Sequence, residues 1–334
     1  MNKWMSLLGS LSLSLASAAT HATDVPFIDA AERSQLVFAS DPQYPWTDFN
    51  DDDRTVSDSD NQKRARELLD EQYRSIADIR KHRSFHHIPV MINGDMTAFG
   101  HGWQRDHLYS VLDQHLNGDY YFGLGNHDYQ NNVNDCAGDG CARDSIFDLR
   151  KRMKDRVDNM DLRTETEGIE FHWKGSLSYT KRIEDVVLVQ LNNEPTYQTS
   201  FWSNRYTFNI TPSLEWLDAR LKEAREKNLI IIVNLHKPDD WMGTREELQR
   251  FRNMMEKYQV SAVFAGHLHK SAGRYNFADQ FADVPVFLSG SASQRSWLIV
   301  DVDRNSGHLK VNKVSNNDWK NAELIAEIPL PKRQ

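Results

Sequence analysis

The chain contains 334 residues, a length that suits one large α/β domain or two smaller ones. Hydrophobic side chains make up 39% and aromatic side chains 10% of it, which is too much apolar character for a disordered protein. Forty basic and forty-eight acidic side chains leave a net charge of -8. Proteins that bind duplex nucleic acid normally present a basic face, so this balance argues against such a partner. It is still compatible with a basic pocket of limited size.

The first 22 residues have the pattern of a cleavable signal peptide. Lys3 gives a short positive region, residues 5–16 form an apolar and serine-rich core, and small residues follow up to Ala22. The core is too short for a permanent bilayer span, so we expect no stable membrane anchor. The pattern predicts a signal peptide over 1–22 and an exported protein, periplasmic or secreted, with one domain over 23–334. The alternative is a disordered amphipathic tail.

Strand-like and helix-like segments alternate along the rest of the chain. Apolar runs of strand length occupy 35–39, 88–92, 120–124, 186–191, 229–233, 262–265, 284–288 and 297–302. Helical spacing of apolar residues occurs over 62–81, 103–115 and 143–160. Thr211-Pro212 is a start signal for a helix to about 227, and a capping box at 244–247 starts one to about 258. We therefore expect an α/β fold of βαβ units around mixed sheets, with a hairpin at 177–191.

Two polar loops require interpretation. Cys136 and Cys141 lie in a glycine-bearing loop, and no further Cys or His stands next to them in the sequence. In an exported protein such a pair predicts a disulfide rather than a zinc site. The acidic run 48–60 is interpreted as a solvated loop. A calcium loop is the alternative, but the run lacks the glycine and the terminal glutamate of an EF-hand.

The apolar strands repeatedly end in side chains that can bind a metal ion. In chain order these are Asp41 and Gln43, then Asp95, then Asn126, His127 and Asp128, then His236, and finally His267 and His269. Ligands of open α/β sheets bind beyond the carboxyl ends of the strands, so parallel strands would bring these groups to one edge. Oxygen and imidazole ligands without thiolate suit divalent Mn, Fe, Zn or Mg. Gly94, Gly125 and Gly266 beside them allow tight turns and a close backbone approach.

The ordered motifs "DPQ", "GD", "GNHD", a single His and "GHLH" together resemble those of the calcineurin-like metallophosphoesterases. The resemblance spans residues 41–269 and implies a metallo-dependent phosphatase fold, in which mixed β-sheets are sandwiched by helices as αββα. It also implies two divalent metal ions. The first would be held by Asp41, Gln43, Asp95 and His269, and the second by Asp95, Asn126, His236 and His267, with Asp95 bridging both.

The same resemblance implies an enzyme that hydrolyses a phosphoric ester or anhydride. A hydroxide between the two ions would attack phosphorus in line with the leaving group. His127 would not bind metal but would act on the leaving oxygen as general acid or as a hydrogen-bond donor to the transition state, with Asp128 orienting it.

Gln43 departs from the usual family pattern, which has Asp-x-His at this point. Glutamine ligates only through its carbonyl oxygen, a harder and weaker donor than imidazole. Asp-x-Gln also occurs in the manganese-dependent ADP-ribose/CDP-alcohol diphosphatase branch, so we expect Gln43 to bind metal and manganese to be favoured. The alternative is a crippled first site. Ala98 stands where purple acid phosphatases have a metal-binding tyrosine, which argues against Fe(III) chemistry of that type.

The substrate is expected to be a small phosphorylated molecule, a phosphodiester, phosphoanhydride or phosphomonoester. Arg105 is a candidate phosphate contact, and Trp103 and Tyr129 are candidates for stacking on a base; the alternative is a solvated helix carrying Trp103 and Arg105. Asn192 and Asn193 either meet the site or make a turn. Two other functions compete, a degenerate phosphoesterase-fold protein that binds without turnover and a secreted effector that uses the fold as a scaffold. Nothing in the sequence indicates an oligomeric state.

Overall fold

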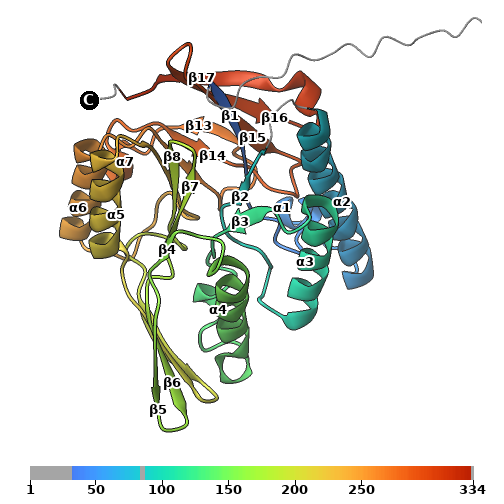
Figure 1. Ribbon diagram of the computed structural model, residues 1–334. Coiled ribbons are helices and arrows are strands. Elements are labelled where there is room, and N and C mark those ends of the chain that lie inside the picture. The colour runs from blue at the N-terminus through green and yellow to red at the C-terminus, as the bar shows by residue number, and fades with distance from the viewer. Residues whose placement is uncertain (1–31, 83–86, 332–334) are drawn as a thin grey trace, which may run out of the picture.

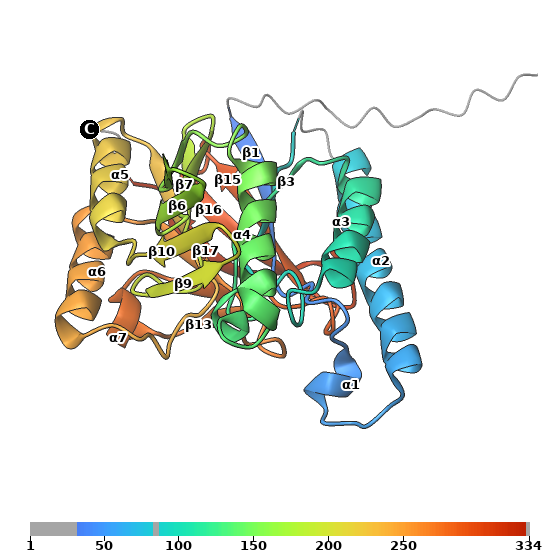
Figure 2. The ribbon, with the colours of Figure 1, turned by 90° about the horizontal axis from the view of Figure 1, so that it is seen from below.

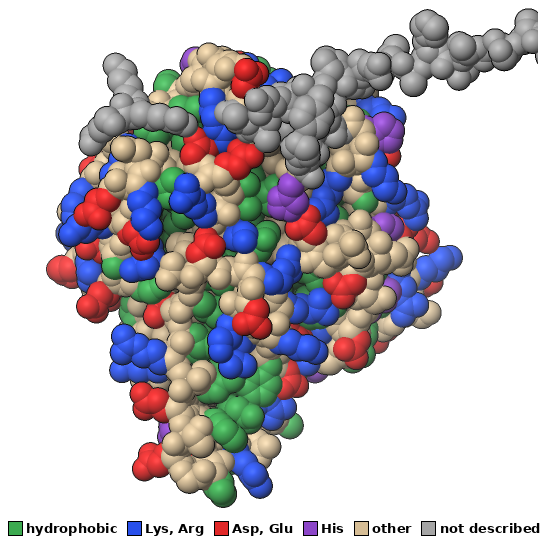
Figure 3. Space-filling model, viewed as in Figure 1, with side chains coloured by type: hydrophobic (Ala, Val, Ile, Leu, Met, Phe, Trp, Pro, Cys, Tyr) green, Lys and Arg blue, Asp and Glu red, His purple; other side chains and the backbone are tan. Residues whose placement is uncertain are grey.

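The computed structural model describes residues 32–82 and 87–331, so the predicted signal peptide lies outside the described residues. These residues form three β-sheets with helices around them (Figure 1). None of the helices in this part of the chain combines the length and the apolar character that a membrane crossing requires. Figure 3 shows basic and acidic side chains interspersed over the face viewed in Figure 1.

The first sheet has six strands in the order β17-β16-β15-β1-β2-β3. Strands β1, β2 and β3 are parallel, and β15, β16 and β17 extend the sheet with antiparallel pairs on the other side of β1. The bounds are β1 (Arg33–Ala39), β2 (Val90–Ile92), β3 (Tyr120–Phe122), β15 (Trp297–Asp303), β16 (His308–Val314) and β17 (Glu323–Pro329). The sheet is therefore mixed, and its three parallel strands are those predicted to precede metal ligands.

The second sheet has seven strands in the order β13-β14-β12-β11-β8-β7-β4. Strands β8, β11, β12 and β14 are parallel, and β7 and β8 form the predicted antiparallel hairpin. The bounds are β4 (Asn159–Met160), β7 (Tyr179–Ile183), β8 (Val186–Gln190), β11 (Ile230–Asn234), β12 (Ala262–Ala265), β13 (Gly273–Tyr275) and β14 (Val286–Leu288). This sheet supplies the strands that precede the predicted histidine ligands.

These two sheets pack face to face between helices (Figures 1 and 2). The rings of Phe38 in β1 and Phe264 in β12 stack between the sheets, with centroids 3.9 Å apart. Along β11, Ile230 and Ile232 belong to the core shared by both sheets, whereas Ile231 and Val233 belong to the core under the helices. Both faces of β11 are buried, which explains its uninterrupted apolar sequence.

The outer helices complete the expected αββα arrangement. Figure 2 shows α2 (Asp58–His82) and α3 (Gly102–Leu116) on one side, and α5 (Leu214–Glu226), α6 (Arg245–Lys257) and α7 (Ala278–Phe281) on the other. Helix α2 buries Leu69, Tyr73 and Ile76 in the same core as β1, at the helical spacing seen in the sequence. The predicted fold class is confirmed.

A third sheet was not predicted. It has the order β5-β6-β10-β9 and lies beside α4 (Gly140–Met153). Phe147 of this helix packs against Trp173 and Phe208 of the sheet. Its bounds are β5 (Arg163–Glu167), β6 (Glu170–Gly175), β9 (Thr199–Ser203) and β10 (Tyr206–Ile210). Strand β5 is exposed at every residue and polar throughout, so it lacks the apolar run by which the other strands were found.

The predicted helix boundaries need two corrections. The helix expected over 143–160 ends at Met153, because Asn159 and Met160 pair with β7 instead. Helix α5 begins after Ser213 rather than after Thr211, because the Thr211 amide donates to the Gly175 carbonyl and prolongs the extended chain. The capping box that starts α6 is confirmed by reciprocal bonds between Thr244 and Glu247.

The polar loops also differ from expectation in one respect. The predicted disulfide between Cys136 and Cys141 is present. The acidic run, in contrast, is not a solvated loop throughout, because it contains α1 (Asp48–Asp51) and the start of α2, and Asp51 points into the protein. Short 3-10 turns occur at Gln130–Asn132, Ala137–Asp139 and Trp319–Asn321.

Candidate metal centre

The predicted ligands follow the carboxyl ends of parallel strands in both large sheets. Asp41 comes after β1, Asp95 after β2 and Asn126 after β3 in the six-stranded sheet. His236 comes after β11 and His267 after β12 in the seven-stranded sheet. Because the two sheets pack face to face, residues from both meet at a shared edge, as ligand sites of open α/β sheets do.

Two glycines make this convergence sterically possible. A Cβ atom on Gly125 would lie 2.2 Å from Asp95 Oδ1 and 2.6 Å from the Asp95 amide nitrogen. A Cβ atom on Gly266 would lie 1.8 Å from Ser40 Oγ and 2.7 Å from Asp41 Oδ2. The motif glycines are thus required by the close approach of one strand end to another, as the sequence predicted.

The backbone is strained at four of the predicted ligands. The φ angles of Asp41, Gln43, Asp95 and His267 are 49°, 33°, 48° and 72°, in the left-handed region that non-glycine residues rarely adopt. Such conformations cost about 1–3 kcal/mol each and persist where the surrounding structure enforces them.

The side chains form two groups whose ligand atoms lie within 4.8 Å of one another. One group consists of Asp41, Asp95 and His269, and the other of Asp95, His236 and His267. Asp95 belongs to both. In the second group His236 Nε2 lies 3.1 Å from Asp95 Oδ2 and 3.0 Å from Asn126 Oδ1. The structure therefore brings the acidic and imidazole ligands into the two sets that the resemblance implied.

Gln43 lies beside the first group and is almost completely buried. Its backbone amide donates to the Asp95 carbonyl at 2.9 Å. Neither the oxygen nor the nitrogen of its side-chain amide has a hydrogen-bond partner among the described residues. Buried polar atoms without partners are costly, so these atoms fit a site that receives a cation.

Three histidines are oriented through their Nδ1 atoms. His236 Nδ1 donates to the Asn93 carbonyl and His127 Nδ1 donates to the Ala98 carbonyl, each at 2.8 Å. A carbonyl only accepts, so Nδ1 carries the proton and Nε2 is left for a metal ion or a substrate. His269 Nδ1 donates at 2.7 Å to Asp51 Oδ1, which leaves His269 Nε2 facing Asp41 Oδ1 at 3.3 Å.

Asp51 is a site residue that the sequence analysis missed. Its Oδ1 atom also accepts from the Trp46 indole, and its Oδ2 atom accepts from Ser293 and Gln294. The carboxylate is thus surrounded by four donors from three segments of the chain and holds the imidazole of His269 in one orientation. No local pattern distinguishes Asp51 from the other acids of the run 48–60, because three of its four partners, His269, Ser293 and Gln294, lie more than two hundred residues away.

Comparison with known proteins decides the family. The sequence profile of the calcineurin-like phosphoesterases matches residues 35–271, which is most of the chain. The chain belongs to the calcineurin-like phosphoesterase family. It is accordingly a phosphoesterase of a family that generally uses a dinuclear centre of divalent metal ions, and its Asp and His side chains form clusters that could hold a metal ion.

Several solved structures resemble this calcineurin-like chain at low sequence identity. GAP50, the anchor in the inner membrane complex of Plasmodium, has 10% identity and a TM-score of 0.48, with 91% of this chain and 90% of that chain covered. The calcineurin-like phosphoesterase YfkN from Bacillus subtilis has 11% identity and a TM-score of 0.40, covering 90% and 93%. A protein serine/threonine phosphatase from Saccharomyces cerevisiae has 9% identity and a TM-score of 0.36, covering 92% and 83%. No curated protein sequence matches significantly.

The electrostatics of the calcineurin-like centre are set by burial and by opposite charges. Burial alone would lower the pKa of His236, but the charge of Asp95 outweighs it and raises that pKa to about 9. Burial likewise opposes the effect of Asp41 and Asp51 on His269, whose pKa is raised to about 10. Burial and the charge of His236 lower the pKa of His267 to about 4. Metal binding would therefore displace protons from two of the three imidazoles.

Asp128 has a different role from the predicted one. Its carboxylate accepts from the backbone amides of Met96, Thr97 and Gly125 instead of orienting His127. Burial and the charge of Asp95 raise the pKa of Asp128 to about 7, against the lowering effect of these amides. Asp128 thus ties the loop after β2 to the loop after β3, and the carbonyl of Ala98 orients His127.

The predicted substrate contacts are mostly wrong. Arg105 is bound to Asp148, Asp144 and the Gly100 carbonyl, so its guanidinium is not available to a phosphate. Tyr129 is completely buried and packs against Tyr197, so it cannot stack on a base. Trp103 is 48% exposed and its role stays a prediction.

Three other residues near the centre have defined contacts. Trp46, which was not predicted, lies edge-on to the rings of His127 and His269 with centroids 5.7 and 5.8 Å away, and it is only partly buried. Asn192 Oδ1 accepts from the Leu124 amide, and the Asn193 carbonyl accepts from the His236 amide. The asparagines therefore join the loops that carry the ligands, whereas Trp46 forms a wall of the site.

Proposed function

We propose that this chain hydrolyses a small phosphorylated substrate with two divalent metal ions. Asp41, Gln43, Asp95 and His269 would hold the first ion, and Asp95, Asn126, His236 and His267 the second. The observation that carries this proposal is the sharing of Asp95 between two ligand groups whose atoms lie within 4.8 Å. One carboxylate with two oxygens can serve two cations, and it neutralises part of the charge of each.

The bound ions would supply Lewis-acid polarisation of the phosphoryl group and activation of a water molecule. The protein contributes a rigid frame for this chemistry. The backbone amide of His127, in the loop after β3, donates to Asp95 Oδ1 at 2.9 Å and fixes the shared carboxylate. The orientation of His236 by Asn93 and of His269 by Asp51 fixes two further ligands before a substrate arrives.

His127 is suited to deliver a proton to the leaving oxygen. Its Nδ1 atom is held by the Ala98 carbonyl at 2.8 Å, so only Nε2 is available to exchange a proton with the substrate. Transfer of that proton to the leaving oxygen, as its bond to phosphorus breaks, would prevent the build-up of an alkoxide charge. Trp46 beside the imidazole would keep bulk water from this face of the ring.

Gln43 is proposed as a ligand of the first ion through Oε1. Its buried and unpartnered amide supports this role, since a cation would satisfy the oxygen and a substrate oxygen could accept from Nε2. Carbonyl oxygen in place of imidazole shifts the preference of the site toward hard ions, with manganese or magnesium ahead of zinc. The Asp-x-Gln sequence, which also occurs in the ADP-ribose/CDP-alcohol diphosphatase branch, supports a phosphoanhydride or nucleotide substrate.

Export of the protein is part of the same proposal. The disulfide between Cys136 and Cys141 is compatible with an oxidising compartment, periplasmic or extracellular. The signal-peptide pattern over 1–22 points in the same direction.

The test is metal analysis of the purified protein, followed by hydrolysis assays with p-nitrophenyl phosphate and its bis ester under manganese, magnesium, zinc and iron. We expect two ions per chain and turnover that is greatest with manganese. A chain that holds one ion or none under every supplement and shows no turnover would overturn the proposal in favour of a binding protein on the same fold.

The role of His127 is tested separately by His127→Ala. We expect the metal content to be unchanged while kcat falls by about 10²–10⁴, the usual contribution of a general acid. His82→Ala, at an exposed histidine on α2, is the matched control and should leave both quantities unchanged. A variant that raises only KM would contradict proton transfer by His127.

A further inference from the structure

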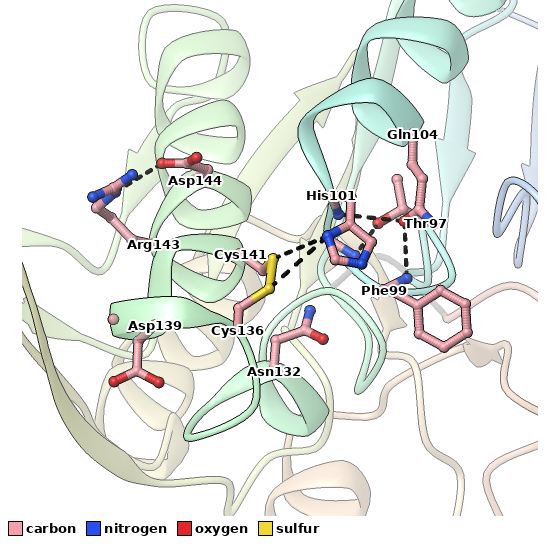
Figure 4. Close-up of a disulfide and its surroundings, with 12 residues drawn as sticks. Thr97, Phe99, His101, Gln104, Asn132, Cys136, Asp139, Cys141, Arg143 and Asp144 are labelled. Carbon is pink, nitrogen blue, oxygen red and sulfur yellow. Dashed lines mark hydrogen bonds and ion pairs between the residues drawn. A yellow bond between two sulfur atoms is a disulfide. The ribbon is translucent and has the colours of Figure 1, made fainter.

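A second set of metal-binding side chains lies outside the centre described above. His101 Nδ1 lies 3.6 Å from the sulfur of Cys141 and 4.0 Å from the sulfur of Cys136 (Figure 4). The three atoms lie within 4.8 Å of one another. His101 directly precedes α3, and Cys141 is the second residue of α4, so the cluster joins the starts of two helices that are about forty residues apart in sequence.

The distances from His101 to the sulfurs are those of a metal site. In a tetrahedral zinc site with Zn–S about 2.3 Å and Zn–N about 2.0–2.1 Å, neighbouring nitrogen and sulfur ligands are about 3.5 Å apart. His101 Nδ1 meets this spacing to Cys141 and comes close to it for Cys136. The two sulfur atoms are bonded to each other and would have to move apart to about 3.8 Å, the spacing of two sulfur ligands in such a site. Reduction of the disulfide permits this movement.

The surroundings favour ligation once the bond is broken. Cys141 lies in the first turn of α4, where the helix dipole stabilises a thiolate. His101 is exposed and Cys136 is half-buried, so solvent can occupy a fourth position and a reductant can reach the sulfurs. Close packing holds the cluster in place, since a Cβ atom on Gly100 would lie 3.1 Å from Cys141 Cβ and 2.5 Å from Asn132 Nδ2.

We propose that reduction of the Cys136–Cys141 disulfide creates a binding site for one thiophilic divalent ion of the zinc class. A dithiol reductant supplies two electrons and two protons, becomes a disulfide itself and leaves two cysteine thiols. The ion then binds His101 Nδ1 and both sulfurs, and the two thiol protons are released to solvent. The oxidised pair does not bind, because the thiolate and not the disulfide is the metal ligand.

This site is chemically distinct from the phosphoesterase centre. The chain contains two cysteines, and both belong to the His101 cluster. The ligands proposed for the phosphoesterase centre are oxygen and imidazole atoms only. A spectroscopic signal of metal–thiolate bonding therefore reports the His101 cluster alone, even when the other centre is loaded with the same ion.

Cobalt(II) is the probe that tests the proposal. The full chain is reduced with a dithiol, freed of the reductant without air, and shown by thiol titration to carry two thiols. We expect a sulfur-to-cobalt charge-transfer band that saturates at one ion per chain in the reduced protein and is absent in the oxidised protein. Two free thiols without such a band would overturn the proposal.

Variants separate a built site from two thiols that happen to bind metal. His101→Ala retains the disulfide and should weaken cobalt binding to the reduced chain by at least about tenfold, since even the loss of an outer-shell partner of a metal ligand has an effect of that size. His82→Ala is the matched control at an exposed histidine elsewhere and should not change the affinity. Equal affinity in the reduced wild type and the reduced His101→Ala variant would overturn the proposal, because the folded position of His101 would then be irrelevant.

Discussion

Single side chains show how far the centre depends on residues other than its ligands. Asp51 receives hydrogen bonds from Trp46, His269, Ser293 and Gln294, and it is nearly inaccessible to solvent. Burial by itself would raise the pKa of Asp51, but the hydrogen bond from His269 and its charge outweigh this and lower that pKa. The charged carboxylate of Asp51 thus accepts from His269 and positions its imidazole. It also holds the indole of Trp46, which borders the site.

Asp51→Asn should weaken metal binding at the first site by about 10–100-fold, the usual effect of removing an outer-shell carboxylate. The amide of asparagine has the shape of the carboxylate, but one of its two polar groups is an NH₂ donor. All four partners of Asp51 donate, so the NH₂ group would face donors and hydrogen bonds would be lost. Calorimetric titration with manganese measures the change. Asp52→Asn, at the neighbouring exposed acid that pairs with Lys270, should bind like the wild type. Equal affinities in the two variants would contradict a positioning role.

At the scale of elements, the centre depends on how strand ends approach one another. The amides of the loops after β2 and β3 converge on Asp128, while Gly125 lies against Asp95 without room for a side chain. The loops after β3 and β8 are joined through Asn192 and Leu124. The loops of the two large sheets are thus joined at the edge where the predicted ligands meet.

Gly125→Ala should abolish metal binding at the shared carboxylate and destabilise the fold by about 1–3 kcal/mol, the cost of overpacking a tight core. The new methyl would overlap the Asp95 amide nitrogen, a backbone atom that cannot swing aside. Metal content and urea unfolding give the two readouts. Gly102→Ala, where the nearest atom to the new Cβ is a flexible arginine nitrogen at 3.8 Å, is the control. Full metal content in Gly125→Ala would show that the strand ends are not closely packed.

At the scale of the whole molecule, helices are fastened to sheets by ion pairs far from the centre. Asp119, just before β3, pairs with Arg80 near the end of α2 and with His87 ahead of β2. Burial would raise the pKa of Asp119, but the hydrogen bond from His87 and the charge of Arg80 lower it on balance. A carboxylate whose pKa is depressed in the folded state stabilises the fold above its unfolded pKa of about 3.9.

Asp119→Asn should lower the free energy of unfolding near neutral pH by up to about 1 kcal/mol, the scale of partly exposed ion pairs. The difference from the wild type should shrink as the pH falls below about 4 and through the lower folded pKa, because the wild-type carboxylate becomes protonated there. Urea unfolding across this range measures it, with exposed Asp283→Asn as the control. A difference that persists unchanged in acid would exclude the charge of Asp119 as its cause.

Much of the architecture was predictable because the signals are local. Apolar runs such as those of β11 and β12 are buried on both faces, and they stand out in any window of the sequence. The capping box of α6 is likewise complete within four residues. Strand β5 and the start of α5 were not predicted correctly, since exposed polar strands lack a pattern and the bond from Thr211 to Gly175 joins distant segments.

The sequence by itself determined the family motifs, the strands that carry them, the disulfide and the need for small residues at Gly125 and Gly266. These follow from short-range order, because each ligand stands directly after an apolar strand. Only the tertiary structure decided that Asp51 accepts a hydrogen bond from His269, that Arg105 forms ion pairs with Asp144 and Asp148, and that His101 lies against the two cysteines. Such contacts join residues tens to hundreds of positions apart, and they are fixed by the packing of two sheets and their helices rather than by any local pattern.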